Sequence, residues 1–211
     1  DFHVTGVQTC ALPISEDLLA ERAVAEVVGA ARAVDPDVDV RELDVAELDA
    51  GSFAELVSPS LFGERRVLVV RGADRGGSAD ADEDAPAASG GQDGLSVLTA
   101  YVKEPTDDVH VVVVHRGVSK GRGLLNAAKK AGAVEIACPA VKRMGDRKAF
   151  VAAEMRAHGR PITQAGAEAL IEAVGGELRA LAAACRQLAD DVEVGGSIDV
   201  DDVRRYYSGR A

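Results

Sequence analysis

Residues 60–70 read SLFGERRVLVV, and two different kinds of structure meet inside this stretch. The Val/Leu run at residues 66–71 lacks polar alternation, which is typical of a strand buried on both faces of a parallel sheet. Directly before it, Leu61 and Phe62 lie between a proline and a glycine, the setting of a turn. Two large apolar side chains at such a place are difficult to bury locally. We therefore expect a buried strand preceded by an apolar pair that inserts into a pocket on another protein.

Helical and strand patterns alternate on either side of this stretch. Helices are expected at 16–35, 52–57, 95–103 and 124–131, and strands at 38–44, 66–71, 109–115 and 133–138. This alternation predicts βα units and an α/β fold, in which helices flank both faces of a parallel sheet. An acidic segment rich in Gly, Ala and Ser at 74–94 interrupts the pattern, and it is predicted to be an exposed, flexible loop.

The strand signals stop after Pro139. Helices are expected at 146–158, 163–174, 177–191 and 199–207, and Gly or Pro residues separate several of them. The sequence therefore predicts two domains, an α/β domain at 16–140 and a small helical, lid-like domain at 141–211.

The first residues differ in composition from the rest of the chain. VTGVQTCALPI at residues 4–14 has neither helical nor strand periodicity, and it resembles an in-frame translation of a sequencing-library adapter. Residues 1–15 are interpreted as an artefact that replaces the natural start, and such segments are excluded from fold reasoning. The alternative is a genuine N-terminal strand.

The composition of the 211 residues excludes several classes of protein. A net charge of −11 is not that of an autonomous nucleic-acid-binding protein, so any DNA contact must be local or shared with partner subunits. Three cysteines without C-x-x-C spacing argue against a disulfide framework and a zinc site. No apolar run approaches about 20 residues, so no membrane partner is expected, and the predicted location is the reducing cytoplasm.

An α/β domain followed by a small helical domain resembles the outline of an AAA+ ATPase, but the catalytic motifs are not visible. A phosphate loop should place Lys and Ser/Thr at the start of the first helix, where Glu16 and Asp17 stand. A magnesium-binding acid should follow a core strand, yet His115 and Arg116 follow residues 111–114. We expect no catalytic residue, cofactor or metal. The alternative is an active ATPase whose phosphate loop was lost with its N-terminus.

Three smaller features contain residue types that can bind metal ions or phosphate groups. His110 and His115 lie on opposite faces of one strand, so they are not expected to share a metal, and both are predicted to be solvated at the strand ends. KGRG at 120–123 is either a phosphate-binding turn or a plain helix start. A basic cluster lies where the two domains are predicted to join, and it consists of Lys142, Arg143, Arg147 and Lys148.

This basic cluster can contact a DNA backbone, or it can be a solvated face or an interdomain salt bridge. A DNA-binding regulator that uses the cluster is therefore a further hypothesis for the chain.

Several stretches resemble, in their order and spacing, the delta subunit family of bacterial DNA polymerase III. They are EDLLAERA at 16–23, SLFGERR at 60–66, GGEL at 175–178, QL at 187–188 and IDVDDV at 198–203. The resemblance covers residues 16–211, the first two of that family's three domains. The chain is therefore expected to be truncated at both ends, without the family's first strand and its C-terminal collar domain.

The resemblance implies a non-catalytic, AAA+-like subunit of a DNA-directed DNA polymerase holoenzyme that opens the sliding clamp for loading onto primed DNA. The implied partners are the sliding clamp (beta), the other clamp-loader subunits (tau/gamma and delta prime) and primed DNA within the complex. The family's Leu-Phe pair, which enters a hydrophobic pocket on the clamp, maps onto Leu61 and Phe62, flanked by Ser60 and Gly63. ATP would act through the other subunits.

Overall fold

The structure is a computed structural model that describes residues 17–58, 64–74, 90–116, 118–192 and 196–207. The chain divides into two compact units, Asp1–Pro139 and Ala140–Ala211. Among the described residues, the first unit contains three strands and four α-helices, and the second unit contains four α-helices.

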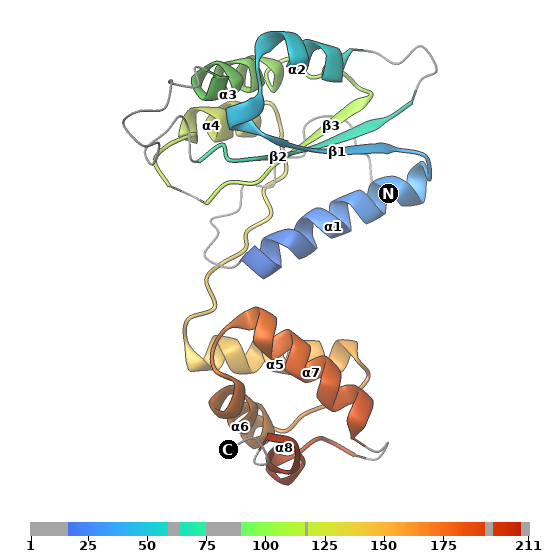
Figure 1. Ribbon diagram of the computed structural model, residues 1–211, viewed down its shortest axis with the longest axis vertical. Coiled ribbons are helices and arrows are strands. Elements are labelled where there is room, and N and C mark those ends of the chain that lie inside the picture. Colours follow the sequence, from blue (N-terminus) through green and yellow to red (C-terminus); the bar gives the residue numbers. More distant parts are fainter. Residues whose placement is uncertain (1–16, 59–63, 75–89, 117, 193–195, 208–211) are drawn as a thin grey trace. The chain divides into compact units, whose positions relative to one another are not determined.

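The first unit is built on a parallel sheet with the strand order β1-β2-β3 (Figure 1). The strands are β1 (Asp39–Asp44), β2 (Arg66–Arg71) and β3 (Val109–Val113). The central strand β2 has four fully buried residues between its two terminal arginines. Because both faces of this strand are covered, its sequence is apolar at every central position.

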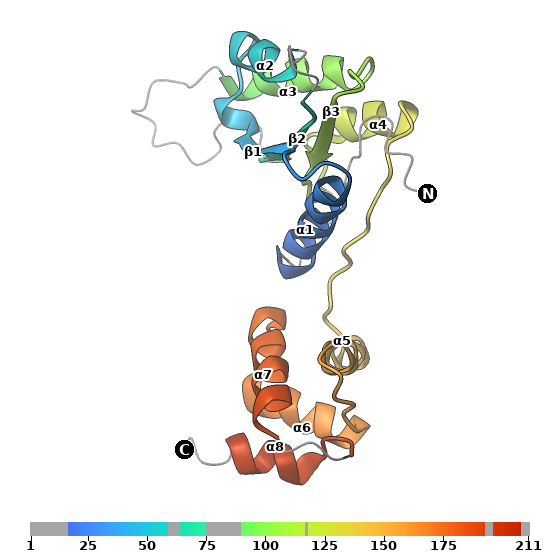
Figure 2. The same cartoon turned by 90° about the vertical axis from the view of Figure 1, so that its right-hand side faces the viewer.

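Helices cover both faces of the sheet, as Figures 1 and 2 show. α1 (Asp17–Val34) lies on one face, and α2 (Ala50–Val57), α3 (Gly90–Tyr101) and α4 (Arg122–Lys130) lie on the other. Because successive side chains of a strand point to opposite faces of the sheet, the core has two layers. Val67 and Val69 pack on the α1 side, whereas Leu68 and Val70 pack on the opposite side.

α2 is a short helix with a strong start. The carboxylate of Asp49 accepts hydrogen bonds from the amides of Gly51 and Ser52 at 2.8 and 2.9 Å, and Ser52 completes a capping box. Phe53 is buried in the core and packs edge-on against Tyr101 of α3, with ring centroids 5.4 Å apart. The helix is therefore held both at its first turn and along its buried face.

The second unit consists of α5 (Met144–Ala157), α6 (Gln164–Val174), α7 (Leu178–Asp191) and α8 (Val200–Tyr207). Its largest fully buried side chains are Met155, Leu170, Leu178, Leu181, Leu188 and Ile198. A parallel bridge joins Ile162 to Ile198, where the amide of Thr163 donates to the carbonyl of Ile198 at 2.9 Å. This bridge ties the turn before α6 to the turn before α8.

The α/β prediction is confirmed, but the strand expected at 133–138 is wrong. Ala133 still closes the end of α4, because its amide donates to the carbonyl of Ala128 at 3.0 Å. The residues that follow have no strand assignment, although Cys138 is buried on the α1 side of the sheet. An alternating apolar pattern can place side chains in a core, but a strand also needs backbone hydrogen bonds to a neighbouring strand.

The prediction of an exposed loop at 74–94 is also wrong at both of its ends. α3 begins at Gly90 and includes Gly94. The Asp74 side chain is only 8% exposed, and its carboxylate lies 3.9 Å from the Nε of Arg116. Residues 75–89 lie outside the described part of the chain.

Candidate functional site

The predicted clamp-binding residues Leu61 and Phe62, with Ser60 and Gly63, lie outside the described residues. The structure describes the chain on both sides of them. On one side α2 ends at Val57, and on the other side β2 begins at Arg66.

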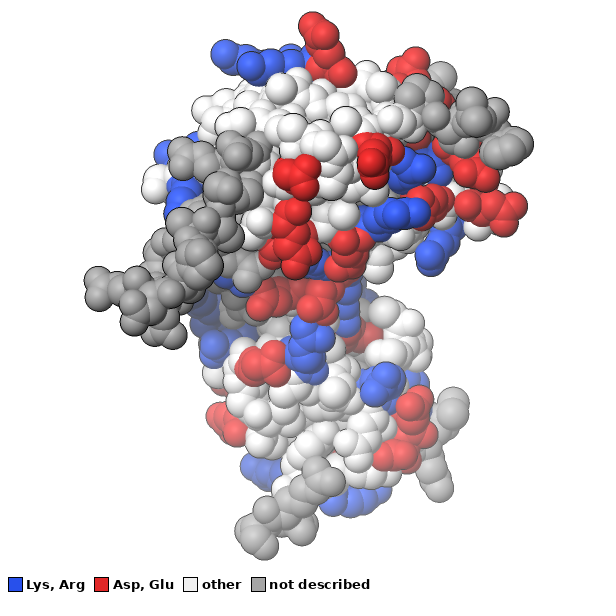
Figure 3. Space-filling model, turned by 45° about the horizontal axis from the view of Figure 1, so that its top comes forward, with Lys and Arg blue, Asp and Glu red and all other residues white. Residues whose placement is uncertain are grey.

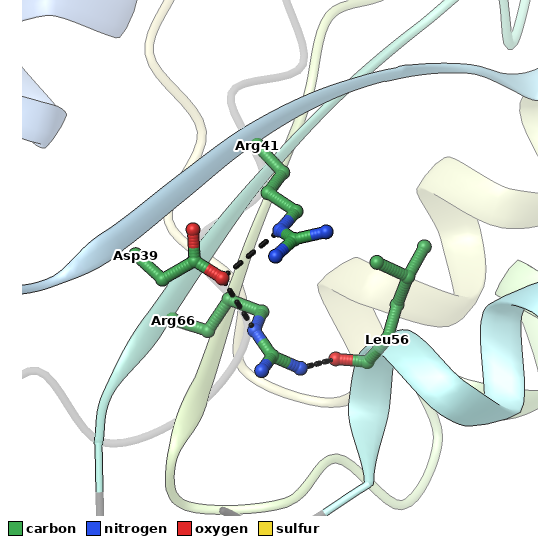
Figure 4. A network of polar contacts seen from close by, with 4 residues as sticks. All are labelled: Asp39, Arg41, Leu56 and Arg66. Atoms are coloured by element: carbon green, nitrogen blue, oxygen red, sulfur yellow. Dashed lines mark hydrogen bonds and ion pairs between the residues drawn. The ribbon is translucent and has the colours of Figure 1, made fainter.

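A polar network joins the end of α2 to the starts of β1 and β2 (Figure 4). The Oδ2 atom of Asp39 accepts from the Nε atoms of Arg41 and Arg66 at 2.9 and 3.1 Å. The Nη1 atom of Arg66 donates to the backbone carbonyl of Leu56 in the last turn of α2. The Arg66 side chain is 18% exposed, whereas that of Arg41 is 55% exposed. Both flanks of residues 59–63 therefore meet at one partly buried guanidinium group.

Sequence reasoning missed this network. Asp39 and Arg66 are far apart in the sequence, and they become direct neighbours only through the register that pairs β1 with β2. A charged residue at the first position of each strand was the one available signal, and it identifies a contact only when the register is known.

The four basic residues predicted to contact DNA have different surroundings. Lys142 and Arg143 are exposed before and at the N-cap of α5. The Nζ of Lys148 donates to a carboxylate oxygen of Glu168 in α6 at 3.3 Å. The guanidinium of Arg147 lies so close to Gly176 that a Cβ there would be 2.3 Å from its Cζ. Arg147 and Lys148 therefore also make contacts within the helical unit.

Positive charge is not concentrated on the face drawn in Figure 3. There, Lys and Arg side chains are interleaved with Asp and Glu side chains rather than gathered by sign. A DNA contact by the described residues of this face would therefore have to be local.

A cavity of about 190 Å³ lies at the carboxyl ends of β2 and β3, beside the start of α1. Open parallel sheets bind ligands at this edge, and a helix N-terminus there favours an anion. Asp17 and Glu21 of α1 line the cavity together with Asp74. These three carboxylates face two guanidinium groups in the same lining, so the cavity has no concentration of positive charge for a phosphate group. The remaining lining residues are Ala20, Arg71, Gly72, Val114 and Arg116.

The KGRG turn is packed into the loops around it. Gly121 is the N-cap of α4 with φ 75°, and a Cβ there would lie 2.3 Å from the carbonyl oxygen of Ala73. The Nε2 of His115 donates to the carbonyl of Lys120 at 2.7 Å. This glycine is therefore required for the helix start itself, independently of any phosphate.

The prediction that the two histidines are solvated is wrong. His110 and His115 are 5% and 1% exposed. His110 belongs to β3, whose residues are all buried, and His115 follows it beneath the turn that begins α4. Among the described residues, no group of three or more His, Cys, Asp or Glu is placed to hold a metal ion.

The two described cysteines are poor nucleophiles. Burial, followed by the charge of Glu154, raises the pKa of Cys185 to about 12. Burial, followed by the charge of Glu26, also raises the pKa of Cys138 above its ordinary value. Because the thiolate is the reactive form, both thiols are inert near neutral pH.

None of the helices within the described ranges has the length and apolar character needed to span a membrane.

No protein-family model matches the sequence, and no curated protein matches it. Solved structures do match. The DNA clamp loader delta protein of Bacillus subtilis aligns with a TM-score of 0.65 at 18% identity, over 96% of this chain and 58% of that chain. The RuvB Holliday junction branch migration motor of Thermotoga maritima aligns with a TM-score of 0.51 at 13% identity, over 97% of this chain and 61% of that chain.

The fold is AAA+-like. The chain spans 58% of the length of the clamp loader delta protein and 61% of that of RuvB. At these identities the similarity establishes a shared fold, and it leaves the function to be argued from the chain's own residues.

Proposed function

We propose that the chain is the clamp-binding part of a delta subunit of a bacterial clamp loader, which opens the sliding clamp for loading onto primed DNA. The observation that carries this proposal is the structural similarity to the DNA clamp loader delta protein over 96% of the chain. The cavity at the carboxyl edge of the sheet is lined by three carboxylates and two arginines, so it lacks a concentration of positive charge for a phosphate group, which supports a role without ATP hydrolysis.

In the proposed mechanism, Leu61 and Phe62 enter a hydrophobic pocket on the clamp and stabilise a clamp conformation that no longer closes the ring. A few buried apolar anchors carry most of the energy of such an interface. Burial of each side chain contributes about 1.5–3 kcal/mol. ATP would act through the tau/gamma subunits, with delta prime completing the cytoplasmic complex. Within that complex, Lys142 and Arg143 would contact the backbone of primed DNA, and Arg147 and Lys148 lie beside them.

The test is the affinity of the chain for purified bacterial sliding clamps, measured by surface plasmon resonance. The double substitution Leu61→Ala and Phe62→Ala is expected to weaken binding by about 100-fold or more, because two buried apolar anchors are lost. A matched control is Val34→Ala, which truncates an exposed apolar side chain at the end of α1. A double variant that binds within twofold of the wild type would refute the proposal.

A further inference from the structure

We infer that the solvent-facing side of α4 is a DNA-binding surface, which holds the sugar–phosphate backbone without reading its sequence. This α4 face consists of Arg122, Asn126, Lys129 and Lys130. It goes beyond the proposed function, because it includes none of the residues assigned there and does not depend on clamp binding.

The segment around α4 is basic in a chain that is acidic as a whole. Residues 109–134 contain five Lys or Arg residues and no Asp or Glu, whereas the full chain has 24 basic and 35 acidic residues. Salt screens exposed charges over about 8–10 Å, so the local charge decides whether a phosphate backbone is attracted. The α4 segment is therefore a place where the chain can bind an anionic polymer despite its net charge of −11.

The polar residues of α4 lie on one side of the helix. Leu124 and Ala128, four residues apart, are buried in the core layer that they share with the sheet. With 3.6 residues per turn, the α4 face points in the opposite direction, and all four of its residues are exposed. The helix contains no Asp or Glu. Figure 2 shows α4 at the outer end of the layer that it forms with α2 and α3.

Most side chains of the α4 face are available to a ligand. Among the described residues, no hydrogen bond or ion pair involves the side chain of Arg122, Asn126 or Lys130. The Nζ of Lys129 lies 2.8 Å from the Oε2 of Glu135, and both side chains are about half exposed. Exposed ion pairs contribute little to stability, so a phosphate can replace this carboxylate at small cost.

The start of α4 is fixed, so the α4 face has a defined position in the first unit. The Nε2 of His115 donates to the carbonyl of Lys120 at 2.7 Å, and Gly121 leaves no room for a Cβ beside the carbonyl oxygen of Ala73. The Lys120 side chain is exposed directly before the helix. Its charge and the positive end of the helix dipole add to the charge of the α4 face.

The residue types of the α4 face favour a nucleic-acid backbone over an acidic protein. Protein–protein interfaces depend on a few desolvated anchors, usually aromatic or apolar, and none of these four side chains is apolar. Arg, Lys and Asn are residue types that bind phosphate oxygens. From Arg122 to Lys130 the helix rises by about 12 Å, and a DNA duplex carries about seven phosphate charges over that length. Several contacts can therefore form at once.

The experiment measures the binding of the full chain to a fluorescein-labelled DNA duplex of random sequence, by fluorescence anisotropy at a series of salt concentrations. Arg122→Gln plus Lys130→Gln removes two charges and keeps good helix formers. At about 50 mM salt, this α4 double variant is expected to bind at least tenfold more weakly, because the counterion release of its phosphate contacts is lost. The slope of log K against log salt is expected to fall in magnitude by about 2.

The matched control is Arg32→Gln plus Lys103→Gln, which removes the same two charges from exposed positions of the first unit. It is expected to bind within twofold of the wild type. Arg122→Lys plus Lys130→Arg keeps both charges and is expected to retain binding. Equal weakening by the control and by the α4 double variant would overturn the inference, because net charge alone would then explain the loss.

The same assay separates this surface from the DNA contact of the proposed function. Lys142→Gln plus Arg143→Gln tests that contact. If this variant alone weakens binding, the role of the α4 face fails and the proposed contact stands. If the α4 double variant alone weakens binding, the proposed contact fails and the α4 face stands. Weakening by both variants supports both contacts.

Polyglutamate tests the alternative partner, an acidic protein. It is expected to bind the wild-type chain much more weakly than the duplex does. Polyglutamate that binds as tightly as the duplex, and loses affinity equally for the α4 double variant, would overturn the assignment to DNA. A wild-type chain without salt-sensitive binding to the duplex would overturn it as well.

Discussion

Asp49 controls the start of α2 through hydrogen bonds that prefer its charged form. The Ser52 amide contributes most, followed by the Ser52 hydroxyl and the Gly51 amide, and together they lower the pKa of Asp49 below its ordinary value of 3.8. A group whose pKa is lowered by folding stabilises the folded state at pH values above its unfolded pKa. The contribution of this cap is therefore lost as the pH falls below about 4 and through the lowered pKa.

Asp49→Ala is expected to lower the melting temperature at about neutral pH, whereas Asp49→Ser retains a capping oxygen and is expected to change it less. The difference between the wild type and Asp49→Ala should be smaller at a pH of about 2 than near neutrality, because the contribution of the cap falls once the pH is below the unfolded pKa of about 3.9. Thermal unfolding followed by circular dichroism checks both expectations. An equal difference at the two pH values would contradict the assignment of the cap.

At the scale of secondary-structure elements, the contact between α3 and the short 3₁₀ helix η1 (Val45–Glu47) outweighs the low helix propensity of the glycines in α3. Glycine is a poor helix former, and the glycines of α3 led to the wrong prediction of a loop. Gly94 lies so close to η1 and the turn after it that an added Cβ would be 2.5 Å from the carbonyl oxygen of Val45 and 2.8 Å from that of Leu48. Here glycine is required for close packing.

The same substitution should therefore have opposite effects in two helices of this unit. Gly29 is exposed in α1 with no atom within 4 Å of an added Cβ, so Gly29→Ala is expected to raise the free energy of unfolding by about 0.5–1 kcal/mol. Gly94→Ala is expected to lower the free energy of unfolding by roughly 1–3 kcal/mol, because backbone must move. Urea denaturation measures both. A stabilising Gly94→Ala would show that the contact with η1 relaxes freely.

The secondary-structure elements that were predicted correctly are those with a strong local sequence pattern. Residues 66–71 were predicted correctly because burial on both faces leaves an unbroken apolar run. α6 was predicted well because Thr163 caps its start and Gly175 ends it. The residues at 133–138 carried the same kind of alternation as a strand, but the pattern does not specify a pairing partner. The Asp39–Arg66 contact likewise depends on register, which no local pattern contains.

At the scale of the whole molecule, each of the two compact units contains one described cysteine. Cys138 is buried in the first unit, and Cys185 is buried among the helices of the second. The chemical labelling of each thiol can therefore report on the unfolding of the unit that contains it. The α/β fold was predictable from the sequence, whereas the roles of Leu61 and Phe62 remain predictions, because these residues lie outside the described part of the chain.

Alkylation of the two thiols is expected to require unfolding of the unit that contains each of them. In a series of urea concentrations, Gly94→Ala should shift the labelling of Cys138 to lower urea and leave that of Cys185 unchanged. Mass spectrometry of tryptic peptides identifies the labelled position. Rapid labelling of Cys185 in native buffer, or a common shift of both thiols, would contradict the expectation of separate cores.

The charged residues at the two ends of β2 help to specify how this strand aligns with β1, whereas its apolar centre does not. Val67, Leu68, Val69 and Val70 are apolar on both faces of the strand, so these four residues alone distinguish poorly between neighbouring alignments. Asp39 meets Arg66 at the first rung, and Arg71 reaches Glu42 at 3.2 Å near the last. A slipped alignment would separate these charges. The degenerate apolar run thus supplies stability, and the charges at its two ends specify a single alignment.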